Sequence, residues 1–161
     1  MQTLDTAKDR TFTIERTFDA PKNLVFDMFT KAEHLKNWYG PGNWTILVSN
    51  LDLREGGSWH YCMENPKGDR QMWGKFEFHE INPTDKLVYT ECMSDPEGNV
   101  MEQMPKMHTT LSFEAIGDKT KLINTIEFAS IQEFEMSAKG GMGKGFEQAY
   151  DKLNELLKAL I

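Results

Sequence analysis

The sequence predicts an α+β protein in which a curved seven-stranded antiparallel sheet wraps around a long C-terminal helix, with two short helices after the first strand. Alternating apolar and polar residues begin near residue 11 and recur between residues 44 and 128, a pattern typical of strands. Apolar residues at helical spacing follow the first strand and return after residue 130. Because helices and strands are segregated along the chain, an antiparallel sheet with helices on one face is favoured.

The first strand is expected over residues 11–18, which read TFTIERTF. Its apolar residues alternate with polar ones, although less regularly at the end. Asp19 or Ala20 is expected to cap the helix that follows, because Pro21 suits a first helical turn. This helix carries an apolar stripe on the face that would contact the sheet.

A second short helix is expected directly after the first. Thr30 can cap it, and it continues to Trp38 with its apolar residues turned inward. The segment Tyr39-Gly40-Pro41-Gly42 then breaks it, since glycine and proline interrupt helices.

Six strands in succession are expected after these helices. Turn sequences rich in Gly, Pro, Asn and Asp separate them, and Gly117-Asp118 joins the last two as a hairpin. The expected ranges are 44–53, 58–64, 72–79, 86–93, 107–116 and 121–128.

The C-terminal segment is helical in its periodicity from residue 131 to residue 160. Four glycines between residues 140 and 145 lower its helix propensity, each by about 1 kcal/mol relative to alanine. The segment is therefore either one continuous helix or a short helix hinged to a longer one. These elements predict one domain over residues 11–161, preceded by a flexible leader over residues 1–10.

Composition excludes several classes of partner. The 161 residues carry 25 acidic and 18 basic side chains, a net charge of −7, which disfavours nucleic acids and anionic membrane surfaces. No apolar run is long enough for a membrane span, and residues 1–10 do not resemble a signal peptide. Two cysteines do not make a disulfide scaffold, so we expect a cytoplasmic protein with reduced thiols. The sequence does not decide whether the protein forms a homodimer through the outer sheet face or an edge strand.

Soft and aromatic side chains are abundant, with 10 Met, 10 Phe, 4 Trp and 4 Tyr. On regular strands most of them share one face of the sheet, and others on the helices can cover that face. We interpret them as the lining of a hollow for an apolar molecule, although plain core packing accounts for any single one. The candidate ligand-binding residues are Met28, Trp38, Trp44, Trp59, Tyr61, Met63, Phe76, Phe78, Tyr89, Glu91, Met107, Phe113, Asn124, Met142 and Phe146.

Three polar residues share the apolar face. Glu91 falls in register with its inward neighbours, where desolvation would raise its pKa and suit it to acid–base chemistry. Alternatively, Glu91 lies near the end of its strand and is exposed to water. Because both placements fit the sequence, Glu91 is a weak catalytic candidate. Asn124 and Thr109 either contact the ligand or satisfy structural hydrogen bonds.

No pattern indicates a metal, a cofactor or an activated nucleophile. The four histidines form no spaced pair, and those at positions 60, 79 and 108 are expected on the outer sheet face. The glycine-rich segment 140–145 lacks the spacing of a phosphate-binding loop. Loops over residues 38–44 and 95–106 are candidate entrances or lids of the hollow.

Several segments, in this order, resemble one family. They read FTIERTFDAPKNLVFDMFT, HLKNWYGP, LDLREGGSWHYCM, MWGKFEFHEINPTDKLVYT, TTLSFEAIGDKTKLINT and GFEQAYDKLNELLKAL. Together they resemble the SRPBCC (START-like, helix-grip) superfamily, in the branch of the activator-of-heat-shock-chaperone-ATPase homologues, often labelled polyketide-cyclase-like. The resemblance spans about residues 11 to 160 and implies a helix-grip fold around an apolar cavity. It implies no single reaction, because members bind varied apolar molecules and a few are enzymes.

Three functions follow as hypotheses. The first is a cytosolic module that binds an apolar or amphipathic small molecule under the C-terminal helix, without catalysis or cofactor. The second is a cyclase or hydrolase in which Glu91, Tyr61 and Tyr89 supply acid, base and oxyanion donor. The third is a regulator of a chaperone ATPase; here we expect no stimulation, because the resembled activator makes much of its contact through a further domain.

Overall fold

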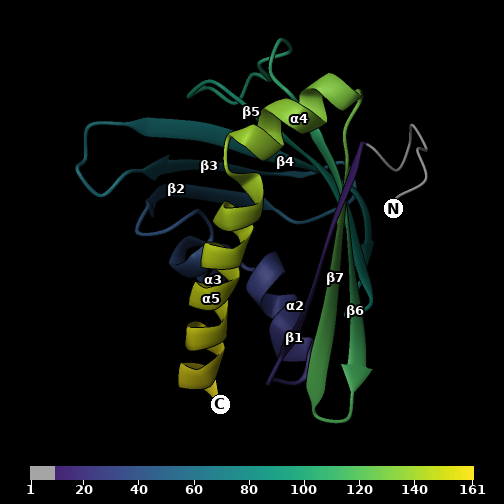
Figure 1. Cartoon of the computed structure of the whole chain (residues 1–161). Coiled ribbons are helices and arrows are strands. Elements are labelled where there is room, and N and C mark those ends of the chain that lie inside the picture. Colours follow the sequence, from purple (N-terminus) through teal and green to yellow (C-terminus); the bar gives the residue numbers. More distant parts are fainter. Residues whose placement is uncertain (1–9) are drawn as a thin grey trace.

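The computed structural model describes residues 10–161 and has the predicted α+β architecture (Figure 1). One strand and two short helices come first, six strands follow, and two helices end the chain. Residues 1–9, nearly all of the predicted leader, lie outside the described residues. The elements are β1 (Thr11–Phe18), α2 (Lys22–Thr30), α3 (Ala32–Trp38), β2 (Thr45–Asp52), β3 (Ser58–Glu64), β4 (Gln71–Asn82), β5 (Lys86–Met93), β6 (Met107–Ile116), β7 (Lys119–Glu127), α4 (Ile131–Lys139) and α5 (Met142–Leu160).

Six consecutive strands form an antiparallel meander, and β1 adds a seventh strand at the edge of the sheet. Its order is β1-β7-β6-β5-β4-β3-β2, so β1 lies beside β7 although the whole meander separates them in sequence. Figure 1 shows β2, β3 and β4 running crosswise to β1, β6 and β7, which is how the sheet curves. This curvature gives the sheet an inner face for the helices and an outer face.

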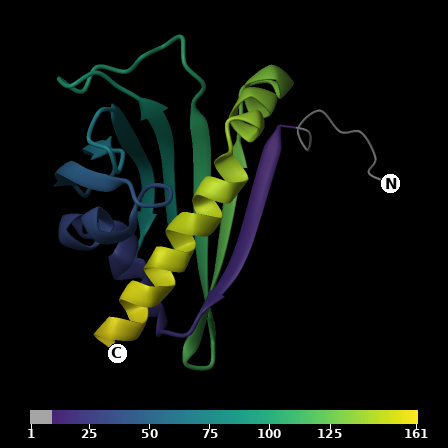
Figure 2. The same cartoon turned by 60° about the vertical axis from the view of Figure 1, so that its left-hand side comes forward.

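Helix α5 crosses the inner face diagonally (Figure 2). Its buried residues recur at one to four positions apart, which places them on one stripe of the helix. They are Ala149, Tyr150, Leu153 and Leu157. Every helix in residues 10–161 is too short or too polar to span a bilayer.

Both short helices form where they are expected and α3 ends at Trp38 as predicted, but their predicted caps are wrong. Pro21, not Asp19 or Ala20, occupies the N-cap of α2, and Lys31 occupies that of α3. Thr30 instead ends α2, where its hydroxyl donates to the carbonyl of Phe26 at 2.9 Å. A hydroxyl that bonds back within its own helix is not available to cap the next one.

The C-terminal segment is broken, so the hinged alternative is correct. Gly140 ends α4 with ordinary helical dihedrals, and Gly141 precedes α5 with φ 91° and ψ 23°. A left-handed residue between two helical segments redirects the chain. As a result α4 turns away from α5 at one end of the molecule, and none of its residues is buried (Figure 1).

Candidate functional site

Glu91 lies at the centre of a buried hydrogen-bonded cluster on the inner face. It is only 7% exposed, although it belongs to β5 near the end of that strand. The hydroxyl of Tyr61 donates to Oε2 at 2.5 Å, and the hydroxyl of Tyr39 lies 2.7 Å from both carboxyl oxygens. The inward interpretation of Glu91 is therefore correct, and we call these three residues the Glu91 cluster.

The chain brings the two phenols to Glu91 in different ways. Tyr39 follows the last residue of α3 and is buried at the point where the helix ends. Tyr61 comes from β3, opposite Gly74 on β4. A Cβ at Gly74 would lie 2.3 Å from the Tyr61 hydroxyl oxygen, so the missing side chain makes room for that phenol.

Aromatic rings surround the Glu91 cluster. Trp59 stacks on Tyr61 with ring centroids 4.4 Å apart, and Phe76 stacks on Tyr89 at 4.0 Å. The ring of Tyr39 meets Trp59 and Phe76 edge to face. The carboxyl and its phenols thus lie in an apolar interior, where electrostatic interactions are stronger than in water.

Burial shifts the pKa values of the cluster. Burial raises the pKa of Glu91, while the hydrogen bonds from Tyr61 and Tyr39 oppose this effect only in part. Burial and then the neighbouring Glu91 raise the pKa values of both phenols well above their ordinary value. The phenols are therefore neutral donors, and the carboxyl favours its protonated form more than an exposed glutamate does.

A second polar contact lies between the sheet and α5. Asn124 of β7 donates through Nδ2 to the hydroxyl of Tyr150 at 2.8 Å, and both residues are buried. Burial is the main cause that raises the pKa of Tyr150, and Glu91 adds to it. The ring of Tyr150 packs against Phe146 of the same helix and against Trp38, which links this contact to α3.

The structure brings most of the candidate residues into one interior, to different depths. Phe113 packs against Phe26 and Phe29 of α2, away from the ring contacts of the Glu91 cluster. Of the remaining candidates, Met28, Trp38, Trp59, Tyr61, Phe76, Phe78, Tyr89, Glu91 and Asn124 are buried. Half-buried are Trp44, Met63, Met107, Met142 and Phe146. Their contact with a ligand stays a prediction.

Two residues of the site are not among the candidates. Tyr39 falls in the segment expected to break the second helix, although an aromatic at the end of an apolar helix is a signal for burial. Gly74 carries a signal as well, because a glycine inside a strand indicates that another group comes close to the backbone. Tyr39 supplies one phenol to Glu91, and Gly74 leaves room for the other, that of Tyr61.

Half-buried methionines gather at the ends of β5 and β6. The amide of Met101 donates to the carbonyl of Met93 at 2.9 Å, and that of Met104 donates to Met101 at 3.1 Å. Glu133 of α4 accepts from the amide of Lys106, so α4 lies at this same end. We call Met93, Met101, Met104 and Met107 the methionine group.

Only part of the predicted lid 95–106 lies near α4. Residues 95–99 form a turn around the Asp95 carboxylate, which accepts from the amides of Glu97 and Asn99. His60 of the outer face contacts the carbonyl of Asp95 at 3.2 Å. This turn therefore covers the outer face, and the methionine-containing remainder of the loop is nearer α4.

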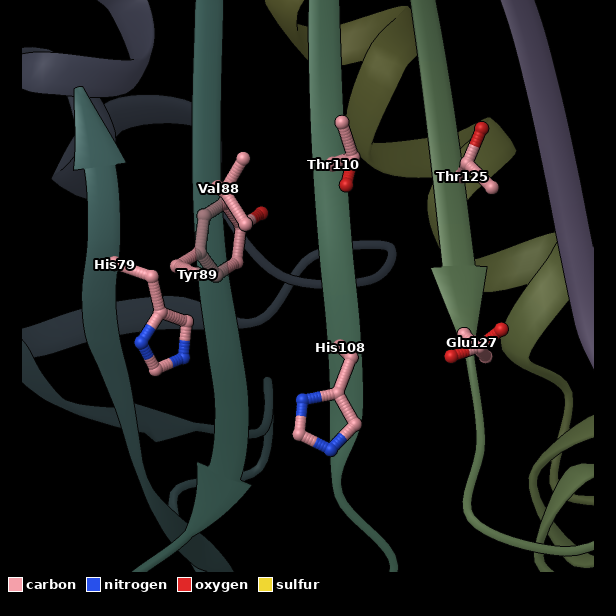
Figure 3. A pocket seen from close by; sticks show the side chains of 7 residues that line it. All are labelled: His79, Val88, Tyr89, His108, Thr110, Thr125 and Glu127. Carbon is pink, nitrogen blue, oxygen red and sulfur yellow. The ribbon is translucent and has the colours of Figure 1, made fainter.

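A hollow of about 210 Å³ lies on the outer face of the sheet, away from the predicted interior (Figure 3). Thr90 is buried beside it and contacts Nε2 of His79 at 2.7 Å and Nδ1 of His108 at 2.9 Å. Within residues 10–161, no group of three or more His, Cys, Asp or Glu side chains is arranged to hold a metal ion. The hollow is lined by His79, Val88, Tyr89, His108, Thr110, Thr125 and Glu127.

Solved structures share this fold at low sequence identity. A protein from Arthrobacter aurescens is 24% identical, with a TM-score of 0.87, over 94% of this chain and 88% of its own. One from Staphylococcus epidermidis is 26% identical, with a TM-score of 0.83, over 94% and 92%. An AHSA1 protein from Silicibacter pomeroyi is 20% identical, with a TM-score of 0.75, over 94% and 99%. These likenesses confirm the helix-grip architecture.

The sequence itself also identifies a family. No curated protein matches the chain. The family model described as activator of Hsp90 ATPase homolog 1-like protein matches residues 19–158, which include the Glu91 cluster, α4 and all but the last two residues of α5. The chain therefore belongs to this AHSA1-like family of the SRPBCC superfamily.

Proposed function

We propose that the protein binds an apolar or amphipathic small molecule between the inner face of the sheet and α5. The observation that carries this proposal is the Glu91 cluster, an ionisable group with two phenols inside an aromatic interior. Burying such groups costs free energy that hydrocarbon side chains would not. Binding sites for small molecules combine a mostly apolar lining with a few placed polar groups, and the cluster fits that description.

The methionine group supports an entrance beside α4. Methionine is flexible and polarizable, so a surface rich in it adapts to apolar molecules of different shapes. Helix α4 has no buried residue, and the glycine pair 140–141 separates it from α5. Displacing α4 separates the ring of Phe134 from the buried Phe128 but uncovers no buried residue of α4 itself, which makes this helix suited to admit a ligand.

Native mass spectrometry of freshly purified protein tests this proposal. A ligand carried through purification adds a defined mass to the folded protein. In parallel, apolar and amphipathic compounds are screened for a rise in melting temperature, because binding to the folded state stabilises it. A protein that carries no added mass and responds to no compound contradicts the proposal.

Two methionine variants locate the ligand. Met142→Ala removes a half-buried side chain at the start of α5, and we expect it to weaken binding several-fold. Met136→Ala makes the same change on α4, where the side chain is 58% exposed, and leaves the affinity unchanged. Equal effects of the two variants would place the ligand elsewhere.

Acid–base catalysis is the second candidate function, and the contact of 2.5 Å between Tyr61 and Glu91 favours it. A carboxyl with a raised pKa can transfer protons to or from a bound molecule. On a substrate found by screening, Glu91→Gln abolishes turnover while binding persists if Glu91 is the acid or base. An unchanged rate would remove Glu91 from that role.

A further inference from the structure

The side-chain oxygen of Asn124 is buried without a hydrogen-bond partner. Within residues 10–161, Oδ1 of Asn124 is the buried side-chain nitrogen or oxygen that lacks one, and the residue is 1% exposed. Its place is the inner face of β7, under α5. A buried acceptor left unpaired costs about 1–3 kcal/mol, so such an atom calls for an explanation.

Tyr150 does not supply the missing hydrogen bond to Oδ1 of Asn124. Nδ2 of Asn124 donates to its hydroxyl oxygen, which leaves the phenol with its own proton to donate. Turning the Asn124 amide over would pair Oδ1 with that proton and leave Nδ2 unpaired instead. The first orientation lacks a partner that both donates and accepts, and the second lacks an acceptor for Nδ2; a hydroxyl group can fill either place.

A lone water is a poor partner at this position. The residues paired with Asn124 on the adjacent strands are Leu111 and Ile14, and its inward neighbours along β7 are Leu122 and Ile126. A buried water makes about three hydrogen bonds, and one here would find only Oδ1 of Asn124 and the phenol of Tyr150, so its second O–H would face these apolar side chains. They suit instead the hydrocarbon part of a molecule whose polar group reaches the amide.

We propose that the ligand carries a hydroxyl group that pairs with the side chains of Asn124 and Tyr150. The hydroxyl donates to Oδ1 of Asn124 and accepts from the phenol, while the apolar remainder packs between the sheet and α5. This inference rests on the proposed function and narrows the ligand to an amphipathic alcohol. Carboxylate ligands are disfavoured, because Oδ1 is an acceptor and the Glu91 carboxyl lies in the same interior.

Compounds of similar chain length test this specificity. We compare 1-decanol, which donates and accepts, with decyl methyl ether, which only accepts, and with decanoate, using titration calorimetry. We expect the wild-type protein to bind 1-decanol at least tenfold more tightly than either of the others. In Asn124→Leu the preference over the ether disappears, because the unpaired acceptor is gone.

Thr109→Val is the matched control, since it also makes a buried inner-face residue apolar. The hydroxyl of Thr109 already donates to the carbonyl of Met107 at 3.3 Å, so we expect the preference for the alcohol to persist. Tyr150→Phe provides a second variant in case Asn124→Leu does not fold; it removes the donor to the ligand oxygen, so we expect it to weaken the binding of both the alcohol and the ether. Addition of 1-decanol also shifts the side-chain amide resonances of Asn124 in the wild-type spectrum.

The outcomes separate the two proposals. Equal affinity for alcohol and ether in the wild-type protein, with no effect of the Asn124 and Tyr150 variants, overturns the hydroxyl assignment and leaves the proposed function standing. Binding of none of the three compounds, together with no ligand detected by mass spectrometry, contradicts both.

Discussion

The protonation of Glu91 governs the electrostatics of the interior. Burial raises its pKa above that of the unfolded chain, so the folded protein binds this proton more tightly than the unfolded one. The contribution of Glu91 to stability is therefore fully present below the unfolded pKa and is lost as pH rises through the folded pKa. Each unit of difference between the two pKa values corresponds to about 1.4 kcal/mol.

Glu91→Gln is the first prediction, because glutamine resembles the protonated acid at every pH. We expect the stability of the wild type relative to this variant to fall as pH rises, and the variant to gain on the wild type at neutral pH. Urea unfolding between pH 4 and pH 8 measures the difference. Glu135→Gln, an exposed change on α4, controls for the loss of one charge. A wild type that gains on the variant as pH rises would contradict the direction of the pKa shift.

Gly74 positions Tyr61, and its substitution is the second prediction. In Gly74→Ala, the new Cβ displaces the phenol, because Tyr61 is held between that backbone and Trp59. We expect a loss of about 1–3 kcal/mol, the usual cost of overpacking a core. Since the bond from Tyr61 lowers the pKa of Glu91, the variant also raises that pKa further.

Tyr61→Phe separates the two effects expected of Gly74→Ala, the lost hydrogen bond to Glu91 and the overpacked core. It removes the same hydrogen bond without adding an atom, and it moves the pKa of Glu91 in the same direction. The pKa of Glu91 is followed by NMR titration of its carboxyl carbon. If Gly74→Ala destabilises the protein but leaves this pKa unchanged, Gly74 is needed only for packing.

At the scale of the elements, the alternation of apolar and polar residues predicted the bounds of several strands. The strands β3, β5 and β6 begin and end where their alternation does, because each buries one face. The caps of α2 and α3 were predicted wrongly. Asp19 and Thr30 have side chains that suit an N-cap, but the chain places Pro21 and Lys31 at these positions. The choice between a continuous and a hinged C-terminal helix stayed open, because its glycines permit both.

The helix break supplies the third prediction. Gly141 has a left-handed backbone, and a Cβ added there would meet no atom within 4 Å, so only its conformation resists a side chain. Gly141→Ala should therefore cost about 1–2 kcal/mol. Gly145→Ala lies inside α5, where its Cβ meets Pro41 at an ordinary 3.6 Å, and should stabilise the protein by up to about 1 kcal/mol. Thermal unfolding measures both, and equal effects would show that the break is not conformationally required.

At the scale of the whole molecule, the sequence predicted which face of the sheet is inward but not how that face is filled. Alternation placed Glu91 and Asn124 inside, because a strand has only two faces. It could not show that Tyr39, from a segment 52 positions away, reaches the carboxyl of Glu91. Nor could it show that a hollow forms on the outer face, since this depends on how four strands align.

The filled interior leads to the last prediction, which concerns rates. Aromatic rings from the sheet and from α3 and α5 occupy the space that a ligand would take, so these elements must move before it enters. We expect association to be slower than about 10⁵ M⁻¹ s⁻¹, the low end for complexes that need no conformational change. Stopped-flow tryptophan fluorescence with 1-decanol measures this rate. The observed rate should level off at high ligand concentration, because opening then becomes limiting. A linear increase with a slope near about 10⁷ M⁻¹ s⁻¹ would instead mean that the ligand reaches a site already open to solvent.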